Sequence, residues 1–175
     1  MLSVSTALAR LQDGLGESFP DLPGTRIIDV AFPLNDAFDP LLWCGQQAQW
    51  PQFYWQQRNG DEELATLGAV KTFTSLDAAN RFLRQAGRQD LRICGLNAFA
   101  PQQGRLVLPR LEWRRCGGRA VMRLVLHSDL SLRDDAMTAR DFLASLTTAQ
   151  ATPGGVPPLL SERHSSDYPL WQAMI

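Results

Sequence analysis

The sequence is poor in the side chains that most often hold metals or act as nucleophiles. Its 175 residues include one lysine, two histidines and three cysteines. The cysteines are odd in number and widely spaced, which fits a reduced cytosolic protein better than a disulfide framework. Neither histidine has a second histidine or a cysteine at metal-ligand spacing. We therefore expect neither a disulfide scaffold nor a metal centre built from these residues.

An excess of charge and a long apolar run are also missing. The 17 basic and 18 acidic residues give a net charge of −1, which argues against a general binder of nucleic acid or membrane surfaces. No apolar run approaches the roughly 20 residues of a membrane span. Residues 1–5 have neither the basic nor the apolar region of a secretory signal. We expect a cytoplasmic protein without a nucleic-acid or membrane partner.

The residues that are present predict an α+β fold with an antiparallel β-sheet and flanking helices. A hydrophobic content of 45% is enough for a packed core. Apolar residues at intervals of three and four predict helices over 3–15, 40–49, 74–86 and 131–147. The inward residues predicted for the second and third of these helices are Leu41, Leu42 and Trp43, and Leu76, Ala79, Phe82 and Leu83.

Strands are expected from β-branched and aromatic runs, from alternation and from turn residues. A β-hairpin is predicted over 51–73, turning at Asn59-Gly60, and a second one turns at Gly117-Gly118. In the second hairpin, the first arm alternates Leu111, Trp113 and Arg115 against Glu112 and Arg114. The second arm alternates Met122, Leu124 and Leu126 against Val121, Arg123 and Val125, and at least one face should be buried. The predicted strands outside the first hairpin are 26–32, 91–99, 105–108, 110–116 and 119–127.

The chain divides into three parts on composition. Residues 1–150 form the expected α+β region, and residues 151–166 form a linker rich in proline and glycine, which propagates neither helix nor central strand. Residues 167–175 resemble the start of a helix of less than two turns, which is marginal alone. Ile175 is therefore expected to be a cut end that leads into a missing region.

Catalytic candidates each have a simpler structural interpretation. Asp61, Glu62 and Glu63 could bind Mg²⁺, but at a hairpin tip they are expected to be solvated. A general base at His127 or His164 would need a partner that the sequence does not show, so both are interpreted as strand-end or surface residues. The cysteines are interpreted as structural, with two in the core and one beside basic neighbours; they are Cys44, Cys94 and Cys116.

Six arginines gather in one stretch of strands, which we call the arginine meander: Arg105, Arg110, Arg114, Arg115, Arg119 and Arg123. They could form a face that binds a dicarboxylate such as chorismate, because arginine suits bidentate carboxylate contacts. They could instead pair with acidic groups elsewhere in a longer enzyme. We favour the second explanation, because alternating basic residues usually mark the outer face of a strand.

Four blocks of the sequence resemble the N-terminal part of the menaquinone-specific isochorismate synthases of enteric bacteria. They are Arg26-Ile27-Ile28-Asp29-Val30, the run from Phe53 to Glu63, Gly95-Leu96-Asn97-Ala98-Phe99, and the run from Leu108 to Gly118. The resemblance extends in order from near Met1 to Ile175. Because such enzymes are much longer than 175 residues, it implies that the catalytic half is absent.

The resemblance implies the N-terminal part of the chorismate-utilising, anthranilate synthase-like fold, and an enzyme that isomerises chorismate to isochorismate with Mg²⁺. In that family a lysine is proposed to activate water, within a Lys-Val-Val-Leu-Ala-Arg-like motif. No such motif occurs here, and Lys71 has a different context. No catalytic, cofactor-binding or metal-binding residue is therefore assigned, no cofactor is expected on this chain, and the chain is predicted to be inactive alone.

The implied partners are the C-terminal catalytic region of the parent chain and, through the whole enzyme, chorismate. Two other hypotheses remain open. The chain could be a free-standing, non-catalytic binding module derived from the same fold. It could also be a divergent enzyme of the chorismate lyase type that uses the arginine meander.

Overall fold

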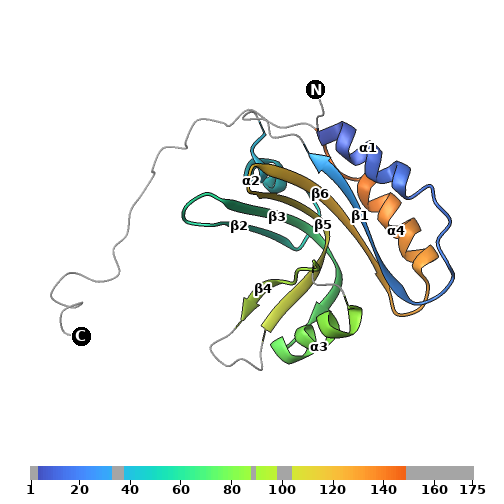
Figure 1. The fold of residues 1–175 in the computed structure, drawn as a ribbon. Helices are drawn as coiled ribbons and strands as arrows, with labels where there is room; N and C mark the ends of the chain where they lie inside the picture. Colours follow the sequence, from blue (N-terminus) through green and yellow to red (C-terminus); the bar gives the residue numbers. More distant parts are fainter. Residues whose placement is uncertain (1–3, 33–37, 88–89, 98–103, 149–175) are drawn as a thin grey trace, which may run out of the picture.

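The protein forms a six-stranded antiparallel sheet with helices on both faces (Figure 1). The structure is a computed structural model that describes residues 4–32, 38–87, 90–97 and 104–148. Within these residues the helices are α1 (Val4–Gly14), α2 (Pro40–Gly45), α3 (Leu76–Ala86) and α4 (Leu132–Ala144). The strands are β1 (Gly24–Phe32), β2 (Gln52–Gln56), β3 (Glu62–Phe73), β4 (Cys94–Asn97), β5 (Gly104–Cys116) and β6 (Arg119–Ser128).

The sheet has the strand order β1-β6-β5-β3-β2, and β4 pairs with β5 beyond the end of β6. The predicted hairpin at Gly117-Gly118 is confirmed, since both glycines have positive φ and Cys116 pairs with Arg119. The predicted hairpin at Asn59-Gly60 is also confirmed, with β2 paired to β3. The α+β prediction is therefore correct, and every strand pair is antiparallel.

The larger core lies between one face of the sheet and helices α1, α2 and α4, of which α1 and α4 lie side by side over β1 and β6 (Figure 1). The predicted alternation of the second hairpin is confirmed for five apolar residues, which are all buried in this core. They are Leu111, Trp113, Met122, Leu124 and Leu126.

A smaller core lies under α3 on the other side. It contains Phe73, Ala79, Leu91, Leu106, Leu108 and Val125. Ser75 caps the start of α3 by accepting a hydrogen bond from the Ala78 N–H, and Gly87 ends the helix in the left-handed conformation. The strands thus carry apolar residues on both faces, and both cores are covered by helices.

Several predicted boundaries and burials are wrong. The predicted strands 105–108 and 110–116 are one strand, β5, in which Pro109 pairs with Ala69. The β3–β5 register shifts between Ala69 and Lys71, so the proline lies beside an irregularity, where its missing N–H is tolerated. Strand β4 begins at Cys94, later than predicted.

Two predicted apolar stripes are only partly buried. Helix α2 ends at Gly45 instead of 49, and Leu41 is 53% exposed while Trp43 is buried. The shorter helix ends at its C-cap Gln46, and the Gln47 side-chain amide donates to the Trp43 carbonyl. Leu76, the first residue of α3, is 39% exposed and is not part of the smaller core. The predicted linker, the final helix and His164 lie outside the described residues.

Candidate functional site

The densest group of titratable side chains outside the arginine meander surrounds Lys71, at the end of β3. The Lys71 ammonium lies 2.5 Å from an Asp129 carboxylate oxygen and 3.2 Å from His127 Nε2. His127 Nε2 is also 3.2 Å from the other Asp129 oxygen, and its Nδ1 is 2.9 Å from the Thr25 hydroxyl. We call Thr25, Lys71, His127 and Asp129 the Lys71 cluster.

Register and helix packing bring this cluster together. Thr25 and His127 are paired residues of β1 and β6, so their side chains emerge side by side. The His127 ring meets the Phe82 ring of α3 edge-on, with centroids 5.0 Å apart, and the Lys71 ammonium lies 5.6 Å from the Phe82 centroid. His127 is therefore a strand-end residue, as predicted, but it is half-buried and has side-chain partners.

Burial and the neighbouring lysine determine the pKa shifts of His127 and Asp129 in the cluster. Burial and the neighbouring Lys71 charge lower the pKa of His127, against the opposing effect of Asp129. The hydrogen bond from Lys71 lowers the pKa of Asp129. At neutral pH the cluster thus holds a cationic lysine, an anionic aspartate and a neutral imidazole. This set can bind an anion or exchange a proton, but it contains no nucleophile held by a base.

The tip of the first hairpin is an ion-pair network, and not the solvated turn that the sequence predicted. Glu62 lies 2.7 Å from Arg92 and 3.2 Å from Arg114, and its pKa is lowered chiefly by the hydrogen bond from Arg92. Glu63 is buried and lies 3.0 Å from Arg115. Asp61 is exposed, as predicted.

Tyr54 completes this network from β2. Its hydroxyl donates to Glu63 at 2.7 Å, and burial together with this bond raises the pKa of Tyr54 to about 12. Both glutamates are therefore engaged by neighbouring donors. Within the described chain, no group of three or more histidine, cysteine or acidic residues is placed to hold a metal ion. The arrangement of Glu62 and Glu63 does not fit Mg²⁺.

The last arginine of the arginine meander pairs with acidic residues of the same chain. Arg123 of β6 makes a bidentate contact with Asp29 of β1, at 2.7 and 2.8 Å, and lies 3.2 Å from Asp90. Glu112 of β5 is opposite Arg123 in the register and is buried, so burial raises its pKa. Arg105 and Arg119 are exposed. Arg123 thus pairs with acidic groups of this chain, and the favoured explanation, pairing with acidic groups elsewhere in a longer enzyme, stays a prediction.

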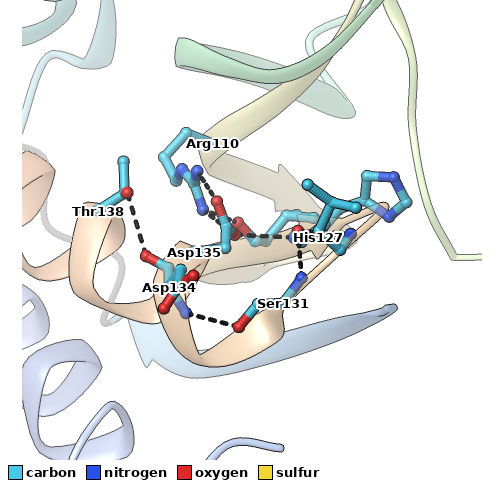
Figure 2. Close-up of polar contacts among 9 residues, drawn as sticks. Arg110, His127, Ser131, Asp134, Asp135 and Thr138 are labelled. Carbon is cyan, nitrogen blue, oxygen red and sulfur yellow. Dashed lines mark hydrogen bonds and ion pairs between the residues drawn. The ribbon is translucent and has the colours of Figure 1, made fainter. Parts of the chain in front are cut away.

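Arg110 is the exception to the predicted outer face. It is 5% exposed and makes a bidentate ion pair with Asp135 of α4, at 2.6 and 2.7 Å (Figure 2). Arg110 also donates to the Val125 carbonyl, and Asp135 accepts the His127 backbone N–H at 2.9 Å. This buried group ties α4 to β5 and β6, and it is a structural element of the sheet–helix junction.

The cysteines have structural roles where they are buried. Burial raises the pKa of Cys44 to about 11 and that of Cys94 to about 12, so both thiols stay protonated at neutral pH. Cys116 is exposed at the second hairpin turn. The prediction that Cys44 and Cys94 lie in the core is confirmed.

Comparison with known proteins adds a specific match to this geometry. No protein-family model matches the chain. Isochorismate synthase MenF of Escherichia coli strain K12 is 53% identical over 176 residues, which cover 100% of this chain and 41% of that protein. The chain is similar to this enzyme over its whole length. MenF of Haemophilus influenzae is 29% identical over 122 residues, covering 70% of this chain and 27% of that protein.

A solved structure of the Escherichia coli enzyme, the menaquinone-specific isochorismate synthase MenF, has the same fold in this part. It superposes with a TM-score of 0.83 at 57% identity, covering 87% of this chain and 36% of that one. The predicted resemblance to the N-terminal portion of these synthases, and to the chorismate-utilising fold, is confirmed. The chain spans about two fifths of the length of the Escherichia coli relative. In the described part of the chain, no helix has the length and hydrophobicity needed to span a membrane.

Proposed function

We propose that this chain forms the N-terminal scaffold of an isochorismate synthase, which isomerises chorismate to isochorismate with Mg²⁺ in menaquinone biosynthesis. The observation that carries the proposal is 53% identity to the Escherichia coli enzyme across the whole chain. Identity of this extent over the whole chain supports a shared role in a shared protein. We place the enzyme in the cytoplasm.

The described residues supply structure to this enzyme, and the chemistry comes from elsewhere. The carboxylates of Glu62 and Glu63 are held by arginines, and the single lysine is paired with Asp129. We infer that the general acid, the general base and the Mg²⁺ ligands belong to the part of the longer proteins that this chain does not cover. The chain is thus a scaffold that is inactive alone.

An apolar surface supports packing against a further region of protein. A hollow of about 490 Å³ opens over β2, β3, β4 and β5, and Phe53, Leu96 and Val107 are among its lining residues. Leu96 is 77% exposed, and Trp50, next to the lining residue Pro51, is 73% exposed. Large apolar groups gathered at one site mark an interaction surface. We infer that the C-terminal catalytic region covers this hollow.

The inactivity is tested by adding chorismate and Mg²⁺ to the 175-residue chain and measuring isochorismate. We expect no product above the uncatalysed rate, because no group of three or more histidine, cysteine or acidic residues in the described part of the chain is placed to hold Mg²⁺. The Escherichia coli enzyme in the same assay is the positive control, and a cooperative thermal transition shows that the chain is folded. Isochorismate formed by the folded chain alone would contradict the proposal.

The alternative, a free-standing binding module with the same fold, is favoured by the two closed cores. Helices of this chain cover a buried core on each face of the sheet. This alternative predicts that the catalytic part of a synthase gains no activity from the chain.

A further inference from the structure

The Lys71 cluster forms one wall of a hollow of about 510 Å³ between α3 and the paired ends of β1 and β6. Helix α3 contributes the opposite wall through residues spaced at three and four, which share one helical face: Ala78, Arg81, Phe82 and Gln85. Phe73 and Ala86 add apolar surface. The hollow therefore combines an apolar wall with a few charged and polar groups, as small-molecule sites do.

We propose that this hollow binds a small organic carboxylate, with its anionic group on Lys71 and Arg81 and its apolar body against Phe82. Such a site lies outside the isomerisation proposed above and does not depend on it. The ligand class follows from the lining, which holds two permanent cations, one aspartate and a neutral histidine. The net charge of about +1 suits a monoanion.

Asp129 is easily displaced from its ion pair with Lys71. Asp129 has a side chain 74% exposed, and the Lys71 side chain is 27% exposed. Exposed pairs of this kind contribute little to stability, because water solvates both partners and holding them together costs side-chain entropy. A ligand carboxylate that is partly removed from water by the apolar wall can therefore take the place of Asp129 on Lys71.

His127 can form hydrogen bonds whether Asp129 or a ligand carboxylate is bound to Lys71. With Asp129 in place, Nε2–H can donate to the carboxylate 3.2 Å away while Nδ1 accepts from Thr25. In the other neutral tautomer, Nδ1–H donates to the Thr25 hydroxyl and Nε2 accepts from Lys71. The imidazole thus keeps partners on both nitrogens when Asp129 turns outward into water, which removes the penalty for an unpaired buried group.

Size and polarity distinguish the proposed ligand from an inorganic anion. A volume of about 510 Å³ exceeds what phosphate fills, and the Phe82 ring offers an apolar contact that phosphate cannot use. Benzoate has the charge and a flat apolar body. Benzamide has nearly the same shape without the charge. The three compounds therefore separate the anionic and apolar parts of the recognition.

The single lysine makes the test unusually direct. In the full chain labelled with ¹³C-lysine, every lysine signal comes from Lys71, so titration with benzoate can be followed at one side chain by NMR. We expect a saturable shift of the Lys71 signals, with an affinity for benzoate at least about tenfold higher than for benzamide, because a charge-assisted hydrogen bond is lost. Phosphate is expected to bind more weakly than benzoate.

A pair of variants on one helix locates the site. Arg81→Gln is expected to weaken benzoate binding by about tenfold. Arg84→Gln is the matched control, since Arg84 is exposed on the same helix and is not among the residues that line the hollow. An unshifted Lys71 signal at saturating benzoate would overturn the proposal. Equal binding of benzoate and benzamide, benzoate binding no tighter than phosphate, or equal losses in the two variants would overturn it as well.

Discussion

Replacement of Arg110 by methionine is expected to lower the free energy of unfolding by about 3–5 kcal/mol, because it leaves a buried carboxylate without its cation. The side chains of Arg110 and Asp135 are 6% and 12% exposed. Methionine keeps the apolar stem of the arginine, so the loss comes mainly from the unpaired Asp135. Urea unfolding followed by circular dichroism measures the change.

An exposed ion pair of the same helix provides the matched control. Arg133 of α4 contacts Asp21 at 2.6 Å, and both side chains are more than half exposed. Arg133→Met is expected to cost less than about 1 kcal/mol, because surface pairs are worth little. The double replacement Arg110→Met with Asp135→Leu is expected to recover most of the loss, since no buried charge remains. Equal costs for Arg110→Met and Arg133→Met would contradict this account of the junction.

Replacement of Gly68 by alanine is expected to cost about 2–5 kcal/mol, from backbone strain of about 1–2 kcal/mol and a steric clash of about 1–3 kcal/mol. Gly68 has a φ of +66°, and an added Cβ would lie 2.7 Å from Phe142 Cε2 and 3.3 Å from the Arg110 Cβ. The backbone cannot move away freely, because the Gly68 N–H donates to the Pro51 carbonyl.

A substitution at Gly60 distinguishes the cost of backbone strain from the cost of a steric clash. Gly60 has a similar φ of +78°, but an added Cβ would meet no atom within 4 Å. Gly60→Ala is therefore expected to cost only the strain, about 1–2 kcal/mol. Thermal or urea unfolding of the two variants measures the difference. If both alanine variants lose the same stability, the close packing of β3 against α4 at Gly68 does not hold the fold as described.

Local patterns predicted the sheet well where they depend on period and turn chemistry. The Gly117-Gly118 turn and the alternation of β6 are sufficient to define a hairpin, and Met122 and Leu124 are buried as expected. Pro109 misled the prediction, because a proline usually interrupts a strand. It is accommodated here by a register shift in β3, and that depends on a neighbour distant in sequence.

The polar groups show the limit of sequence patterns. Alternation on β5 predicted solvent for Arg110, but the carboxylate that draws this side chain into the protein comes from α4. Glu63 was predicted to be a solvated turn residue, but it forms an ion pair with Arg115 of β5. The Lys71 cluster was missed for the same reason. Its members come from β1, β3 and the end of β6, and only the pairing of Thr25 with His127 hints at their meeting.

The family resemblance contributed what patterns could not. Four blocks of sequence indicated the synthase family, and the identity of 53% to the Escherichia coli enzyme agrees with them. The same resemblance led to no catalytic residue being assigned. That absence stays a prediction, and the structure shows only that the carboxylates of Glu62 and Glu63 are paired with arginines of the chain itself.

A chimera tests most directly whether this chain is the scaffold of an isochorismate synthase. The chain replaces the matching 41% of the Escherichia coli enzyme, and isochorismate formation from chorismate and Mg²⁺ is measured. The scaffold account predicts an active chimera, while the remaining part of the Escherichia coli enzyme is inactive without the chain. A soluble, cooperatively folding chimera without activity would contradict this account and favour the free-standing module.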